Sequence, residues 1–77
     1  MSKLVKLPNG PYIKADSIEK VGEVWDSMGK WNYSISYRNQ EGALSFHTVE
    51  LNPDFIKEKA DALCKQDLFV NKVNESL

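Results

Sequence analysis

Histidine and cysteine, two residue types that often carry chemistry, occur once each, as His47 and Cys64. His47 falls within a predicted strand, two residues after Ser45, so these two side chains would share one face of that strand. Nucleophilic catalysis also needs a group that orients the base and donors for an oxyanion. The sequence around His47 has no glycine-rich turn that could supply them. We therefore interpret His47 as a half-exposed strand residue.

Cys64 falls inside a predicted helix, beside Leu63. A reactive thiolate is favoured at a helix N-terminus or beside a cation, so we expect Cys64 to be a small, semi-buried filler. Glu19 and Glu23 could form an acid–base pair, but strand carboxylates more often keep a sheet edge soluble. With one histidine and one cysteine, no metal site is expected. The sequence predicts no catalytic residue and no cofactor, so we expect a protein that is not an enzyme.

The composition indicates one small, ordered domain spanning residues 1–77. Hydrophobic residues make up 42% of the chain, yet a chain this short buries only about 60% of the surface that its unfolded form exposes. Small domains gain further burial through disulfides, metals or self-association. A single cysteine cannot form a disulfide within one chain. We therefore expect a homo-oligomer, most simply a dimer.

Charge and hydropathy argue against two classes of partner. The chain has 10 basic and 11 acidic residues and a net charge of −1, whereas nucleic-acid binders normally carry a basic excess. No apolar run reaches the length of a signal-peptide core or a membrane span. A lone cysteine suits a reducing compartment. We expect a cytoplasmic protein that binds neither nucleic acid nor membranes.

Five antiparallel strands are predicted between residues 3 and 51. The first two, 3–7 and 12–15, form a hairpin closed by Pro8-Asn9-Gly10-Pro11, because Asn-Gly favours a type I′ turn and proline ends backbone pairing. The other three are expected at 18–26, with a bend at Gly22, at 31–39 and at 43–51. Strict alternation of apolar and polar residues makes 31–39 the clearest strand.

A three-residue loop, Ser27-Met28-Gly29, is expected between the third and fourth strands, with Gly29 left-handed. It sets a register of favourable cross-strand pairs, namely Trp25 with Trp31, Asp26 with Lys30, Glu23 with Tyr33 and Val21 with Ile35. In the fifth strand, Leu44 and Phe46 are out of phase with Val49 and Leu51. A bulge near His47-Thr48 would return all four to one face; without it, both faces are partly apolar.

A helix is predicted over residues 53–75. Asn52 is a favoured N-cap, Pro53 suits the first helical position, and Asp54 complements the helix dipole. One apolar stripe follows, formed by two series seven residues apart: Ile56, Leu63, Val70 and Leu77, with Phe55, Ala62 and Phe69 beside them. A helix that continues past Gln66, straight or slightly bent, is favoured over two helices. The predicted class is α+β, a five-stranded antiparallel sheet with the helix packed on one face. Strong curling would make that sheet a half-barrel.

Two apolar clusters are candidate binding surfaces. Trp25, Met28 and Trp31 bracket one hairpin tip, where such residues either close the core or bind a partner. The other cluster is the end of the helix. A helix of some twenty residues is about 30 Å long and would overhang short strands. A symmetric dimer would bury the overhanging side chains, which are Phe69, Val70, Val73 and Leu77.

These observations predict a non-enzymatic protein–protein interaction module that self-associates. A small protein with no predicted catalytic residue suits the role of an accessory or inhibitor protein of a phage or mobile element, which we take as a hypothesis. The alternative is a small-molecule binder that holds a nucleotide-like ligand between aromatic residues at a subunit boundary. Lys30 and Arg38 are then the candidate contacts for the anion.

Overall fold

The computed structural model describes residues 3–52, 54 and 56–77. Every strand pair in it is antiparallel, and a helix ends the chain, so the predicted α+β class is confirmed. The elements, in chain order, are β1 (Leu4–Lys6), β2 (Tyr12–Lys14), the 3-10 helix η1 (Ala15–Ser17), β3 (Ile18–Val21), β4 (Trp25–Ser27), β5 (Lys30–Arg38), β6 (Leu44–Glu50) and α1 (Lys59–Ser76).

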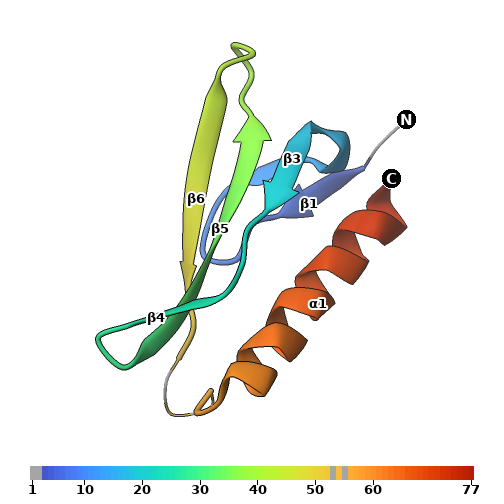
Figure 1. Ribbon diagram of the computed structural model, residues 1–77. Helices are drawn as coiled ribbons and strands as arrows, with labels where there is room; N and C mark the ends of the chain where they lie inside the picture. The colour runs from blue at the N-terminus through green and yellow to red at the C-terminus, as the bar shows by residue number, and fades with distance from the viewer. Residues whose placement is uncertain (1–2, 53, 55) are drawn as a thin grey trace.

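The strands form two sheets, where the sequence predicts one. β1 and β2 make a two-stranded sheet, and η1 turns the chain from it into a four-stranded sheet. There β6 pairs with one edge of β5, while β3 and β4 pair with successive parts of the other edge. α1 crosses one face of this sheet, with the β1–β2 hairpin beside it (Figure 1), and the strands do not close into a barrel. We call the face toward α1 the inner face and the opposite one the outer face.

β3 and β4 are two pieces of the strand predicted at 18–26. The predicted pairing of Val21 with Ile35 is confirmed. Nearer the turn the register differs by one residue, because an extra residue lies between β3 and β4, where the bend at Gly22 was expected. The predicted pairs Trp25–Trp31 and Asp26–Lys30 are therefore wrong, and Glu23 lies outside the paired strands. The observed pairs are Trp25 with Asn32, Asp26 with Trp31 and Ser27 with Lys30.

The β4–β5 turn has two central residues instead of the predicted three. Met28 and Gly29 have φ angles of 54° and 78°, as a type I′ turn requires at both positions. Gly29 is left-handed as predicted, but Ser27 belongs to β4. Paired residues share a face and successive ones alternate. Trp25 consequently lies on the outer face, and Trp31 on the inner face.

The β1–β2 hairpin is confirmed, but its turn is not of type I′. The Gly10 amide donates to the Leu7 carbonyl oxygen at 2.9 Å, so Pro8 and Asn9 are the central residues. Asn9 is left-handed, with a φ of 56°, which together with the preceding proline gives the type II pattern. The turn rests against β6, where His47 Nε2 lies 2.7 Å from the Pro8 carbonyl oxygen.

β5 and β6 pair in one unbroken register, from Asn32 with Glu50 to Arg38 with Leu44. The bulge considered at His47-Thr48 does not occur in this ladder, all of whose residues are described. Val49 is therefore on the inner face and buried, while Leu44 and Phe46 are on the outer face and exposed. The structure thus shows the alternative to a bulge, in which both faces of β6 carry apolar residues.

α1 begins later than predicted, at Lys59; the expected first residue Pro53, and Phe55 of the stripe, lie outside the described residues. Asn52 does not cap α1. Its side-chain oxygen accepts from the Asp54 amide at 2.9 Å, and its carbonyl oxygen accepts from the Ile56 amide at 2.9 Å. Ile56 is buried in the core, and the chain is extended at Glu58 before the helix starts. α1 then runs through Gln66 without interruption, as favoured above.

The core lies between α1 and the inner face. The largest of its fully buried side chains are Leu7, Tyr33 and Ile35. α1 adds Ala62, Phe69 and Val73, whereas Leu63 and Leu77 of the predicted stripe are exposed. The buried face of α1 is therefore rotated about the helix axis relative to the predicted stripe, and it includes the half-buried Gln66.

Candidate interaction surfaces

The β4–β5 turn separates the residues of the predicted partner patch. Met28 at its tip is 98% exposed, and Trp25 on the outer face is 40% exposed. Trp31 is half-buried on the inner face and packs against the core. The structure therefore brings Trp25 and Met28 to the surface, but it does not unite them with Trp31 in one patch.

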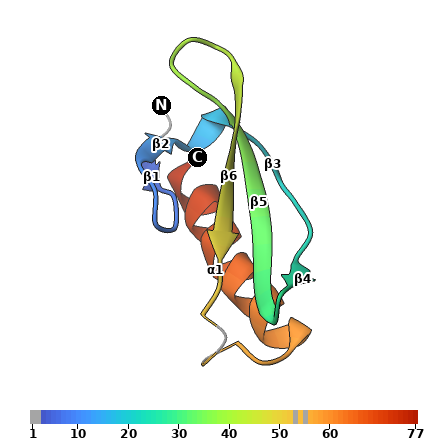
Figure 2. The same ribbon diagram turned by 90° about the vertical axis from the view of Figure 1, so that its left-hand side faces the viewer.

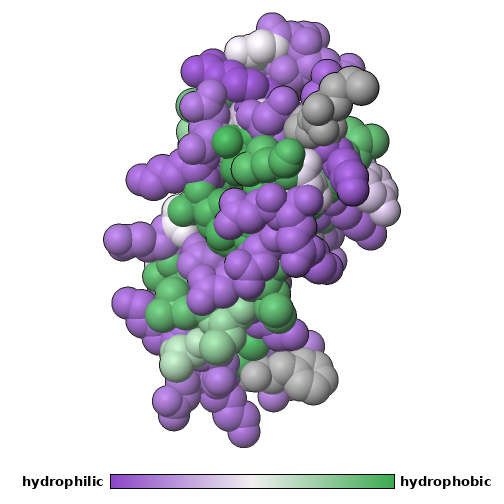
Figure 3. All heavy atoms as spheres, turned by 90° about the vertical axis from the view of Figure 1, so that its right-hand side faces the viewer, coloured by the Kyte–Doolittle hydropathy of each residue, from purple (hydrophilic) through white to green (hydrophobic). Residues whose placement is uncertain are grey.

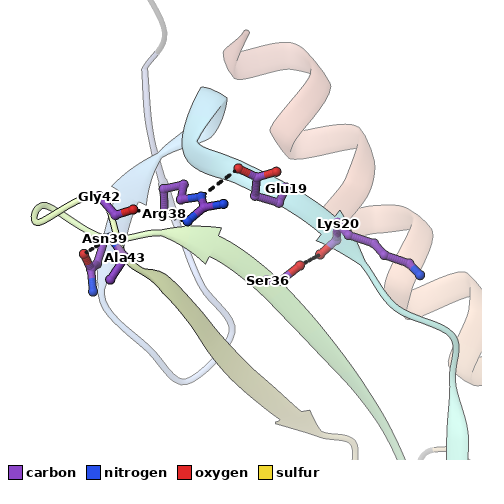
Figure 4. Close-up of polar contacts among 7 residues, drawn as sticks. All are labelled: Glu19, Lys20, Ser36, Arg38, Asn39, Gly42 and Ala43. Atoms are coloured by element: carbon purple, nitrogen blue, oxygen red, sulfur yellow. Dashed lines mark hydrogen bonds and ion pairs between the residues drawn. The ribbon is translucent and has the colours of Figure 1, made fainter.

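Lys30 and Arg38, the predicted anion contacts, lie at opposite ends of β5. Lys30 Nζ is 2.7 Å from Glu50 Oε1, and Arg38 Nε donates to Glu19 Oε1 at 3.1 Å. Arg38 also donates through Nη1 to the Gly42 carbonyl oxygen at 3.2 Å (Figure 4). Each cation already has a carboxylate partner, and the two are not placed to hold one anion.

The end of α1 is less exposed than predicted. Phe69 and Val73 are buried in the core of the single chain. Val70 is half-buried and Leu77 exposed. With Val73 they line a groove between α1 and β3. Figure 3 shows that hydrophobic residues form a broken band on one side of the molecule. Of the predicted self-association residues, only Val70 and Leu77 offer appreciable surface.

His47 and Ser45, the pair considered for nucleophilic catalysis, each have another partner in the structure. His47 is half-buried, as expected, and its Nε2 contacts the Pro8 carbonyl oxygen, while the Ser45 hydroxyl oxygen accepts from Asn39 Nδ2 at 3.0 Å. Cys64 is exposed, so its expected partial burial is wrong: it lies on the solvent side of α1, two residues from the buried Ala62. The described histidine, cysteine and acidic side chains form no group that could hold a metal ion.

The outer edge of β6 is a surface that the sequence reasoning missed. Phe46 is 70% exposed and Leu44 is 45% exposed, both on the outer face. β6 pairs with β5 alone, and none of the other backbone hydrogen bonds among the described residues involves β6. Figure 2 shows this strand at the near edge of the sheet. The phase slip between Phe46 and Val49 was the available signal, but a bulge explained it equally well.

A second missed feature is a hollow of about 350 Å³ beside the β1–β2 turn. Tyr33 and Phe69 are among the buried residues that line it, and Lys65 and Lys72 of α1 stand at its rim. Burial raises the pKa of the Tyr33 phenol to about 12, so the hydroxyl stays neutral at ordinary pH. Sequence reasoning could not find this hollow, because β1, β6 and α1 meet only in the folded chain.

No protein-family model, curated protein sequence or solved structure matches this chain. Among the described residues, no helix combines the length and the apolar character needed to cross a bilayer.

Proposed function

We propose that this chain is a non-enzymatic protein-interaction module whose first partner is a second copy, joined through the open edge of β6. The observation that carries the proposal is the exposure of Phe46 and Leu44 on a seven-residue strand that has a neighbour on one side only. An edge strand presents unpaired amide and carbonyl groups, which another strand can satisfy.

The β6 edge lacks the usual safeguards against pairing. Natural edge strands carry lysine, proline or a bulge, and residues 44–50 contain no lysine or proline and pair with β5 without a bulge. Glu50, the one carboxylate of β6, is the last residue of the strand, and its Oε1 lies 2.7 Å from Lys30 Nζ. These features favour strand addition at β6.

A two-fold axis at Ser45 gives the most complementary pairing. Antiparallel strands related by that axis place Leu44 of each copy opposite Phe46 of the other, so the dimer gains two apolar cross-strand pairs. An axis at His47 would instead place Leu44 opposite Glu50. It would also centre the second copy beside the β1–β2 turn, which contacts His47.

Light scattering of the purified chain tests the proposal. We expect a molar mass of twice the 8.8 kDa of one chain. Phe46→Lys places a charge opposite Leu44 at both symmetric positions, so this variant should be a monomer with an unchanged circular dichroism spectrum. Asn71→Lys adds the same charge on an exposed part of α1 and should remain a dimer. A monomeric wild-type chain, or a dimeric Phe46→Lys variant, would refute pairing at β6.

A different protein is proposed to bind at the β4–β5 turn, which lies across β5 from β6 and stays free in such a dimer. Met28 and Trp25 supply the exposed apolar and aromatic surface there, residue types that are common in interface cores. Peptides selected against the wild-type chain should lose affinity for Met28→Ser and Trp25→Ala. Selected peptides that bind both variants as well as the wild type would contradict this location.

We also propose a cellular setting. An exposed, unpaired Cys64 suits a reducing compartment such as the cytoplasm. A small module that acts by contact alone also suits an accessory or inhibitor protein of a phage or mobile element. Labelling Cys64 with a thiol reagent directly after cell lysis tests the compartment, since a side chain already oxidised in the cell would not react.

A further inference from the structure

The hollow of about 350 Å³ lies where the β1–β2 turn, β6 and α1 meet. Its floor consists of core side chains, and Leu7, Tyr33 and Val49 are all buried there. Leu68 of α1, which is 58% exposed, adds an apolar wall that the fold leaves open to solvent. Sites for small ligands are concave and mostly apolar, with volumes of roughly 300–1,000 Å³, so this hollow is at the small end of that range.

Positive charge gathers around this apolar floor. Lys65 and Lys72 are seven residues apart on α1, which places them two turns apart on one face of the helix. Lys6 of β1 lines the hollow as well, and no aspartate or glutamate is among its described lining residues. Neither of the two ion pairs found among the described residues uses these lysines. The chain as a whole has a net charge of −1, so the local charge is opposite in sign to the total.

The hollow has few uncharged polar groups that could form hydrogen bonds with a ligand. Asn9 is the lining residue with a free amide side chain, and the Pro8 carbonyl oxygen is already in contact with His47 Nε2. The Tyr33 hydroxyl is neutral at ordinary pH. A nucleobase needs several donors and acceptors along its edge, whereas an alkyl body needs none. The lining therefore fits an apolar body better than a base.

We propose that this hollow binds a small molecule with an apolar body and a single terminal anionic group. The body lies against Leu68 and the buried floor, and the anion is held by the ammonium groups of Lys65, Lys72 and Lys6. Carboxylate and phosphate monoester both satisfy this chemistry, and the test below separates them. The inference does not depend on pairing at β6, because that pairing uses the open edge of β6 with Leu44 and Phe46 on the outer face, whereas the hollow opens beside the inner face.

Four probes, used below their micelle concentrations, test the site by amide chemical-shift titration of the full chain. Decanoate and decyl phosphate should shift the signals of Lys6, Lys65, Leu68 and Lys72 and should saturate; the tighter of the two identifies the anion. Decanol lacks the charge and should bind more weakly, and acetate lacks the body and should give no saturable shift. Decanol binding as tightly as both anions would refute the role of the lysines.

Variants at exposed positions separate the charge from the apolar wall. Lys65→Gln with Lys72→Gln should weaken decanoate binding about fivefold, the effect of losing two solvent-exposed charge contacts. The control pair Lys14→Gln with Lys57→Gln removes the same charge outside the hollow and should bind like the wild type. Leu68→Ser should weaken decanoate and decanol alike. Equal affinity of the two lysine pairs, or shifts centred on Phe46 that disappear in Phe46→Lys, would overturn the proposal.

Discussion

A glycine can be required because a side chain would clash, and not only because its φ angle is positive. Gly10 is an example, because it is not among the residues with positive φ. A Cβ atom at this position would lie 2.8 Å from His47 Cε1 and 3.0 Å from His47 Nε2. The glycine therefore lets the β1–β2 turn approach β6 closely enough for His47 to reach the Pro8 carbonyl oxygen.

We expect Gly10→Ala to destabilise the fold by about 1–3 kcal/mol, the usual cost of overpacking. The same change in a His47→Ala background should cost less, because the ring that the new Cβ would strike is gone and the Leu7 Cβ, at 3.1 Å, is the close contact that remains. Urea unfolding of both single variants and the double variant gives the coupling energy. Additive effects, with no coupling beyond about 0.5 kcal/mol, would show that the turn does not depend on this contact.

We expect the buried Tyr33 to make the stability of the fold depend on pH in the alkaline range. Burial raises its pKa from 10.0 to about 12, so the folded state holds the phenolic proton that the unfolded state releases. The stabilisation is complete below pH 10 and is lost as pH rises from 10 toward 12, with a slope of at most about 1.4 kcal/mol per pH unit. Tyr33→Phe has no such proton and should lose less stability between pH 9.5 and 11.5. Parallel urea curves for the two proteins over that range would contradict this assignment.

At the scale of elements, the break between β3 and β4 is held by α1. The Gly22 amide donates to the Ser34 carbonyl oxygen at 2.7 Å, and the Gly22 carbonyl oxygen accepts from Gln66 Nε2. Gln66 thus satisfies a backbone group where the strand register shifts. This contact explains why the polar Gln66 lies on the side of α1 that faces the core. Without it the Gly22 carbonyl oxygen would lose its partner, and an unpaired backbone carbonyl away from water is costly.

Gln66→Met keeps the length of the side chain and removes the donor, so we expect it to destabilise the fold by about 1–2 kcal/mol. Asn71→Met makes a comparable amide-to-thioether change on the exposed side of α1 and should alter stability by less than about 0.5 kcal/mol. Hydrogen exchange should also become faster at the Gly22 amide in Gln66→Met alone. Equal stabilities of the two variants would show that the contact with Gly22 contributes nothing.

Regular patterns in the sequence predicted elements well, and irregular ones did not. Strict alternation placed β5 within one residue of its observed bounds, with Tyr33 and Ile35 buried. The predicted helix start was wrong because the Asn52 side chain can accept a backbone hydrogen bond two residues on whether or not a helix follows directly. The candidate surface at the edge of β6 was harder to predict than the elements. The exposure of Phe46 depends on whether a bulge forms, and the pairing of the whole β5–β6 ladder decides that.

At the scale of the whole molecule, the margin of stability is thin. A chain of 77 residues has a free energy of unfolding of about 4–12 kcal/mol at typical values per residue. The chain ends are tied together by the Lys3 amide, which donates to the Ser76 carbonyl oxygen at 2.8 Å, and Leu7 of β1 is fully buried. The two ion pairs found among the described residues are exposed and contribute little to stability.

Pairing at β6 makes the melting temperature depend on protein concentration, because dilution favours unfolded single chains. Raising the concentration a hundredfold should raise the Tm of the wild-type chain by on the order of 5–10 °C, as expected for a domain of this size. Phe46→Lys should melt at one temperature throughout, and Asn71→Lys should follow the wild type. Differential scanning calorimetry across the series measures all three. A constant wild-type Tm would mean that the exposed phenylalanine at the edge of β6 serves some purpose other than joining two copies.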